Sequence, residues 1–293
     1  MFSVSDNQEI SVRDVLKPLV FLDLFDFPLT AYEIWHYLGR RGSLAALKLT
    51  LENAASEIIS QKNGFYFLNG RENIVEIRKI RYNYSCHKVK IARRFARAFA
   101  LLPFVKTIAV ANFIGDHNLR QEGDIDFFII TSARRIWLSR LFCAGLAKLL
   151  NSRPTTANKR DKICLSFYIS EEHLDIRDLA LGHDDPYFYY WLRGLLPIYN
   201  SRNFYQRFLT ANQLSTENII DSAAARFSWL DILEKIAKSW QLRIMSPDLK
   251  RAVNNSDGVV ISDSVLKLYL GDRRRLFAEK FKSKYDELLQ KIN

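Results

Sequence analysis

Residues Ile108–Thr131 read IAVANFIGDHNLRQEGDIDFFIIT, and the fold prediction depends on this stretch. An apolar run is followed by a polar loop, by Asp124-Ile125-Asp126 and by a second apolar run, Phe127–Ile130. Successive side chains of a strand point to opposite faces, so Asp124 and Asp126 share one face about 7 Å apart. Two carboxylates in this arrangement suit a hard divalent cation such as Mg²⁺. Two solvated acids at the end of a strand would produce the same pattern.

The composition predicts a folded protein with an excess of positive charge. The chain has 293 residues, of which 48% are hydrophobic, and a formal net charge of +11. Such a charge favours polyanionic partners. The cysteines, Cys86, Cys143 and Cys164, show no metal-ligand or disulfide spacing and are typical of free thiols in a reducing compartment. No signal peptide or membrane-spanning run is visible, so we expect a cytoplasmic protein without membrane contact.

The first part of the chain has the element order of a winged helix. Ser11 is expected to cap a helix over residues 11–25, and Thr30 with Glu33 forms a capping box for a second helix. A third helix is expected over Ser43–Ile59, before a hairpin that turns at residues 62–64. Winged helices read DNA or dock proteins, and the sequence leaves both roles open.

Residues 78–100 are predicted to form a basic helical connector. The segment Arg78–Arg97 contains basic residues and no acid. A basic stripe is expected because four of these residues recur at three- and four-residue spacing: Lys90, Arg93, Arg94 and Arg97. Such a stripe fits a nucleic-acid track and a solvated helix face alike.

The second half of the α/β core is expected to follow Thr131. Residues 133–150 have the apolar pattern of a helix, and Lys162–Ser170 has that of a buried strand. Between them lies a basic loop whose Lys159, Arg160 and Lys162 would neutralise a triphosphate near the acidic pair. The remaining chain, including Tyr187–Trp191, is helical by pattern.

The Ile108–Thr131 stretch resembles the nucleotidyltransferase fold of the DNA polymerase β superfamily, in a bacterial branch with a winged-helix segment ahead of the transferase domain. In that pattern a strand leads to a Gly-Ser pair, and an Asp-x-Asp follows on the next strand. The resemblance implies that Asp124 and Asp126 are catalytic and hold Mg²⁺. It covers most of residues 11–200, through short matches such as Gly64-Phe65-Tyr66, Pro103-Phe104-Val105 and Lys162-Ile163-Cys164.

The chain departs from this pattern at the phosphate-binding pair. Aligned backwards from the Asp pair, the Gly-Ser positions fall on Asn112 and Phe113, which makes these two the candidate nucleotide-binding positions beside the basic loop. A Phe offers no hydroxyl, and reading Gly115-Asp116 as the pair places an acid where phosphate belongs. The usual third acid is also missing from Lys162–Ser170, although Glu171 follows it.

The sequence therefore predicts an α+β fold with a small mixed sheet in the transferase-type domain. The expected divisions are a winged helix over residues 1–77, the connector over 78–100, a nucleotidyltransferase-like core over 101–175 and a helical C-terminal region over 176–293. One predicted function is Mg²⁺-dependent transfer of a nucleoside monophosphate from a nucleoside triphosphate to a nucleic-acid or protein acceptor, with Asp124, Asp126 or Glu171 accepting the acceptor's proton. The alternative is a catalytically inactive scaffold that contacts nucleic acid or a protein through its winged helix. Whether the chain is an enzyme, and its oligomeric state, are left open.

Overall fold

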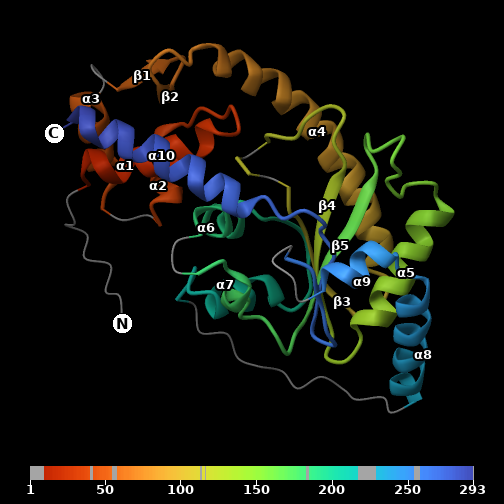
Figure 1. Ribbon diagram of the computed structural model, residues 1–293. Helices are drawn as coiled ribbons and strands as arrows, with labels where there is room; N and C mark the ends of the chain where they lie inside the picture. Colours follow the sequence, from red (N-terminus) through yellow and green to blue (C-terminus); the bar gives the residue numbers. More distant parts are fainter. Residues whose placement is uncertain are drawn as a thin grey trace.

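The computed structural model describes residues 10–39, 42–54, 58–112, 114–115, 117–182, 185–216, 229–253 and 258–292. Within them the chain forms a mixed α/β structure in which a six-stranded sheet is covered by helices on both faces (Figure 1). The helices of the first residues lie at one end of this layered core, beside the helix of residues 274–292 (Figure 1).

The N-terminal unit consists of three helices and a hairpin: α1 (Val12–Asp23), α2 (Ala31–Tyr37), α3 (Leu44–Ala54), β1 (Ile59–Lys62) and β2 (Phe65–Leu68). The predicted starts of α1 and α2 are confirmed, since Ser11 and Thr30 each form a capping box. The predicted hairpin is present as an antiparallel pair. The third helix ends before Ile59, because Ile59 pairs with Leu68 in the hairpin.

Helices far along the chain complete the core of this unit. α6 (Pro186–Arg193) and α10 (Arg274–Ile292) pack against α1, and the Phe21 and Tyr190 rings stack with centroids 4.4 Å apart. Lys284 of α10 pairs with Asp23, and the Tyr285 hydroxyl donates to the Arg13 carbonyl. The N-terminal unit therefore depends on residues more than 200 positions away.

One helix, α4 (Asn73–Phe99), runs from the N-terminal unit to the sheet, so the predicted division between residues 77 and 78 falls inside it. Its cations differ in their roles. Arg78 bonds to Glu33, and Arg81 to Asp26 and the Phe25 carbonyl, which fastens α4 to the N-terminal unit. The predicted basic stripe is exposed on the outer face of α4: Lys90, Arg93, Arg94 and Arg97.

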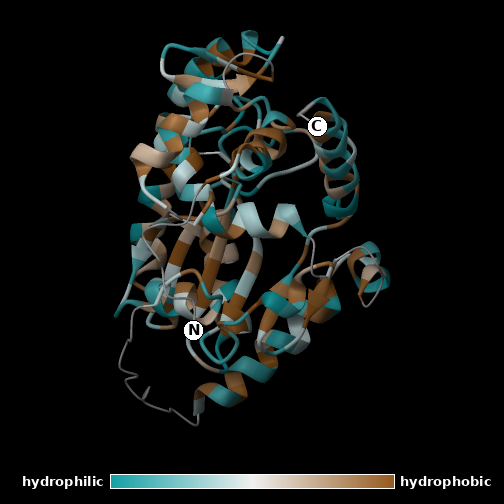
Figure 2. Ribbon diagram, turned by 90° about the vertical axis from the view of Figure 1, so that its left-hand side faces the viewer, coloured by the Kyte–Doolittle hydropathy of each residue, from teal (hydrophilic) through white to brown (hydrophobic). Residues whose placement is uncertain are grey.

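The central sheet has the strand order β6-β3-β4-β5-β8-β7, in which only β4 and β5 are parallel neighbours. Its strands are β3 (Val105–Val110), β4 (Ile125–Thr131), β5 (Ile163–Ser170), β6 (Leu196–Asn200), β7 (Val260–Ile261) and β8 (Val265–Lys267). Apolar residues run along the central strands (Figure 2), and alternation sends Phe127 to one face and Phe128 to the other.

The two faces of the sheet are covered by different helices. α4, α5 (Ile136–Leu149) and α8 (Trp229–Ile244) pack on the Phe127 face. α6 and α7 (Phe204–Ala211) pack on the Phe128 face, next to a single 3₁₀ turn (Arg177–Leu179). α9 (Pro247–Ala252) follows α8. By alternation Asp126 belongs to the Phe128 face.

The region over residues 176–293, expected to be helical, also contributes three strands to the sheet. β6 adds to one edge of the sheet, and β8 with β7 extends the other. These strands are short, and β6 carries Pro197, so none shows a clear two-residue alternation. Their conformation follows from pairing with β3 and β5, which a local pattern does not contain. Among the described helices, none combines the length and apolar composition of a membrane span.

Glu234 of α8 completes the start of α5. No side chain of α5 caps its first turn, and the Glu234 carboxylate accepts hydrogen bonds from the Trp137 and Leu138 amides at 2.7 and 3.0 Å. We expect Glu234→Ala to lower the free energy of unfolding by about 1–2 kcal/mol, the usual cost of a lost N-cap. Chemical denaturation measures this difference, and Lys235→Ala on the exposed face is the control; equal effects of the two changes would contradict the capping role.

Candidate functional site

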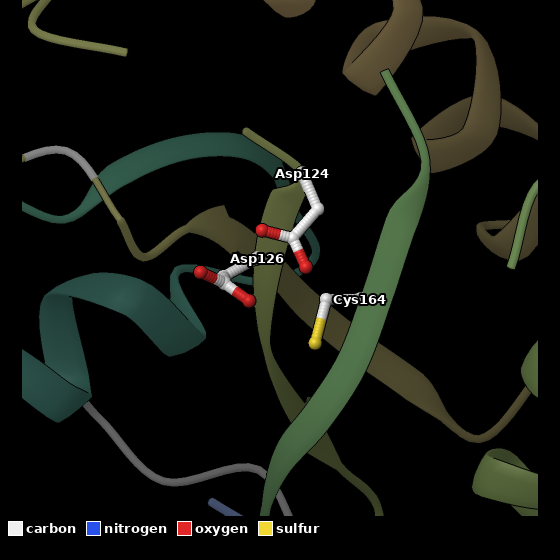
Figure 3. Close-up of side chains that lie close together, drawn as sticks. All are labelled: Asp124, Asp126 and Cys164. Atoms are coloured by element: carbon white, nitrogen blue, oxygen red, sulfur yellow. The ribbon is translucent and has the colours of Figure 1, made fainter. Parts of the chain in front are cut away.

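Asp124, Asp126 and Cys164 lie together where two parallel strands begin. Asp124 immediately precedes β4, Asp126 is its second residue, and Cys164 is the second residue of β5. Asp126 and Cys164 are register partners, so their side chains leave the sheet on the same side. The carboxylate oxygens and the thiol sulfur lie within 4.8 Å of one another (Figure 3).

Two side chains fix the backbone that carries the acids. The Asn112 amide donates from Nδ2 to the Asp124 carbonyl at 2.9 Å and accepts at Oδ1 from the Asp126 amide at 3.3 Å. On the opposite side, the buried Lys88 of α4 donates to the Gly123 carbonyl and to Asp161, at 2.6 and 2.7 Å. Lys88 thus ties the residue before Asp124 to the loop before β5.

The surroundings favour the protonated form of Asp126. The pKa of Asp126 is raised to about 7, first by burial and then by the neighbouring Asp124 carboxylate, while a hydrogen bond from Cys164 and the charge of Lys159 act in the opposite direction. A carboxyl that loses its proton near neutrality is typical of sites that bind a cation or move a proton.

A cavity of about 280 Å³ opens beside Asp126 on the Phe128 face of the sheet. Aromatic rings from three parts of the chain form much of its wall: Phe167, Tyr187, Phe188, Trp191, Tyr269 and Phe277. Phe167 and Trp191 stack with centroids 5.4 Å apart. Its size lies near the lower end for small-molecule sites, and its aromatic lining is typical of them.

The polar part of the cavity wall is a compact charge network. Arg274 bonds to Asp272 and Asp185, and Lys267 donates to Asp272 at 3.1 Å. Burial lowers the pKa of Lys267, with the Arg274 charge acting in the same direction. Arg273 lines the cavity next to this network and is exposed. The structure therefore brings cations to the Asp126 cavity that the sequence pattern did not single out.

The loop from β3 to β4 is turned toward the N-terminal unit. Ile114 is buried among the residues of that unit, and the Asn118 amide donates to the Phe25 carbonyl. Gly115 has a φ of +80°, and a Cβ added there would lie 2.7 Å from the Phe27 ring. A side chain is therefore disfavoured both by the backbone conformation and by the contact with Phe27. Phe113 and Asp116, the two other positions considered for phosphate binding, lie outside the described residues.

The predicted basic-loop residues are placed differently from one another. Lys159 is exposed and near enough to Asp126 to lower its pKa. Arg160 lies 3.6 Å from Glu122 and 3.7 Å from Asp161. Lys162 donates to the Asn151 carbonyl at 2.5 Å. Of the three, Lys159 is the one that acts on the pKa of Asp126.

Two expectations about site residues are corrected. Glu171 follows the far end of β5, about 23 Å from Cys164 at 3.3 Å per residue, and its carboxylate accepts from the Ala133 amide. It therefore cannot accept a proton beside Asp124. Cys164 was expected to be a scattered thiol, because its partners are 38 and 40 positions away in the sequence. Only the pairing of β4 with β5 brings it to the acids.

Three comparisons with known proteins found no match. The chain matches no protein-family model, and neither the curated proteins nor the solved structures gave a match.

Proposed function

We propose that this chain is a divalent-cation-dependent nucleotidyltransferase, which moves a nucleoside monophosphate from a nucleoside triphosphate to an acceptor. The observation that carries the proposal is the Asp124/Asp126 pair at the start of β4, of which Asp126 lines a cavity walled by aromatic rings and cations. Acids that hold a cation, rings that hold a base and cations that neutralise phosphates are the parts that this reaction needs.

The strand arrangement supports the proposal as well. β3 runs antiparallel to β4, so the end of β3 lies beside the start of β4, and β5 starts at the same edge. This order agrees with the strand, loop, Asp-x-Asp pattern of the nucleotidyltransferase fold. A winged helix at the N-terminus remains part of the proposal. It is supported by the order of α1–α3 and the hairpin, and by a single antiparallel bridge between Leu29 and Tyr66 beside the hairpin.

The residues present fit a divalent cation in part. Asp124 and Asp126 offer the oxygen ligands that Mg²⁺ prefers, while the Cys164 thiol is not a ligand of Mg²⁺. A bound cation would neutralise charge on the reacting phosphates. Asp124 and Asp126 would hold it, with Asn112 and Lys88 keeping their backbone in place.

The rest of the cavity would bind and orient the nucleotide. The stacked rings of Phe167, Trp191 and Phe188 in the cavity wall would offer aromatic surface for a base. Arg273 and Lys159 would contact the phosphates, since both are exposed cations near the acidic pair or its cavity. Asn112 would position the two acids and not contact the nucleotide, because its side-chain amide is already hydrogen-bonded to the backbone of Asp124 and Asp126.

The test is transfer of label from each α-labelled nucleoside triphosphate to nucleic acid or protein, measured with a panel of divalent cations. We expect Asp124→Asn plus Asp126→Asn to reduce transfer at least about 1000-fold, because the charge that holds the cation is lost. Asp175→Asn plus Asp178→Asn is the matched control, since these two acids are exposed near the far end of β5. Transfer retained in the site variant would exclude the proposed role.

A second candidate is a scaffold without catalytic activity, and the β3–β4 loop favours it. Ile114 and Gly115 pack against the N-terminal unit. This loop therefore contacts protein at the place where a transferase would be expected to bind phosphate. The exposed cations of α4 would then contact nucleic acid. Nucleotide binding without transfer, together with salt-dependent RNA or DNA binding that Arg93→Ala plus Arg97→Ala weakens, would favour the scaffold.

A further inference from the structure

The third side chain beside Asp124 and Asp126 is a thiol, at a place where a Mg²⁺ site would offer oxygen. Cys164 is the register partner of Asp126, and its sulfur lies within 4.8 Å of both carboxylates. Mg²⁺ requires oxygen ligands in near-ideal octahedral geometry, whereas thiolates select softer cations. The donor set therefore disagrees with the cofactor that the sequence resemblance implies.

We propose that Asp124, Asp126 and Cys164 together bind a thiophilic divalent cation of the Zn²⁺ class. The inference deepens the proposed function, on which its catalytic meaning rests, but cation binding does not require turnover. Among the described residues, no other group of three or more His, Cys, Asp or Glu side chains brings its donor atoms this close.

The geometry requires only a small adjustment to hold such a cation. Zinc bonds of about 2.0–2.3 Å in a tetrahedral site place neighbouring ligand atoms about 3.3–3.6 Å apart. Rotation of the carboxylates, which stand on the same side of the sheet as the thiol, would shorten the present separations of up to 4.8 Å. Neither β4 nor β5 has to move, because Asp126 and Cys164 are already paired in register.

The number of ligands matches a catalytic site. Catalytic zinc sites use three protein ligands and keep a fourth position open, whereas structural zinc sites are closed by four. Asp126 lines the cavity, so the fourth position would face the space that the nucleotide is proposed to occupy.

Two further side chains, Ser166 and Tyr269, form a hydrogen-bonded chain to the thiol. The Ser166 hydroxyl lies 3.2 Å from the Cys164 sulfur, and the Tyr269 side chain is hydrogen-bonded to Ser166. Hydroxyl groups that bond to a ligand atom orient it and tune its affinity. Cys143 and Cys86 lie on helices α5 and α4, away from this group, which makes Cys86 a matched control cysteine.

The experiment uses the full chain, freed of metal by a chelator and titrated with Co²⁺ as a coloured probe. We expect one equivalent to bind, with a sulfur-to-cobalt charge-transfer band and the strong visible bands of four-coordinate Co²⁺. Zn²⁺ should displace it at stoichiometric amounts, and Mg²⁺ in about 1000-fold excess should not. Cys164→Ser should remove the charge-transfer band and weaken Co²⁺ binding at least about tenfold, whereas Cys86→Ser should change neither.

A second variant tests the selectivity directly. Cys164→Asp supplies a third carboxylate and should shift the Zn²⁺-to-Mg²⁺ affinity ratio toward Mg²⁺ at least about tenfold. Absence of Co²⁺ binding, or binding without a sulfur band, overturns the inference, as does a band that survives in Cys164→Ser. If the band behaves as expected and no nucleotide is transferred with any cation, the proposed function fails and the cation site stands.

Discussion

Replacing Lys88 by methionine is expected to lower the free energy of unfolding by about 3 kcal/mol, because it removes one member of a buried ion pair and keeps the volume of the side chain. The Lys88 side chain is 1% exposed, and its ammonium bonds to Asp161 and to the Gly123 carbonyl. Asp161 is 26% exposed and also lies near His87 and Arg160, which places the loss at the lower end of the usual range for such pairs.

Chemical denaturation of Lys88→Met against Lys90→Met measures this effect, since Lys90 lies two positions later on α4 and is exposed. The Lys90 change should stay within about 0.5 kcal/mol. In a double-mutant cycle, adding Asp161→Asn to Lys88→Met should recover part of the loss, because the uncompensated carboxylate is then removed. Additive losses would show that the two side chains are not energetically coupled.

Replacing Asp126 by asparagine is expected to stabilise the metal-free protein by about 2–3 kcal/mol at pH 8. The folded state raises the pKa of Asp126 from 3.8 to about 7, through burial and then through Asp124. The folded protein therefore holds a proton on this group between pH 4 and 7 that the unfolded chain has lost, so folding stability falls as pH rises through this window. A shift of about three units corresponds to about 4 kcal/mol at most, and partial solvent contact reduces it.

The pH profile separates this effect from ordinary packing changes. The difference between Asp126→Asn and the unsubstituted protein should be smallest near pH 4, grow up to about pH 7 and remain constant above it. Urea denaturation in the presence of a chelator at several pH values measures the profile. Asp26→Asn is the control with the opposite sign, because hydrogen bonds from Arg71 and Arg81 outweigh burial and lower the pKa of Asp26. A difference that does not change with pH would mean that the Asp126 pKa is not raised in the folded state.

Features of the fold that depend on local chemistry could be predicted from the sequence. Ser11 and Thr30 start helices because their hydroxyls accept amides three residues later. Residues 62–64 turn the hairpin because Asn63 and Gly64 both adopt positive φ. The edge strand β6 could not be predicted, since its conformation is stabilised by β3 and its own residues include Pro197.

The candidate site divides in the same way. The Asp124/Asp126 pair follows from strand alternation alone, and the two carboxylates lie within 4.8 Å of each other. Cys164 could not be assigned, because a one-residue change in the register of β4 against β5 would turn its thiol to the other face. The cavity wall was missed for a similar reason. Tyr187 and Trp191 have the pattern of core residues, and Arg274 belongs to a helix that reaches the cavity only after the chain has folded back.

The position of α10 beside α1 has a consequence for synthesis on the ribosome. Asp23 and Lys284 are separated by 261 residues, so at about 5–20 residues per second α1 leaves the ribosome roughly 13–50 s before its partner helix is made. During that interval Phe21 lacks the rings of Tyr190 and then Phe281, against which it packs in the folded chain. The N-terminal unit is therefore expected to expose an apolar surface to chaperones until α10 has been translated.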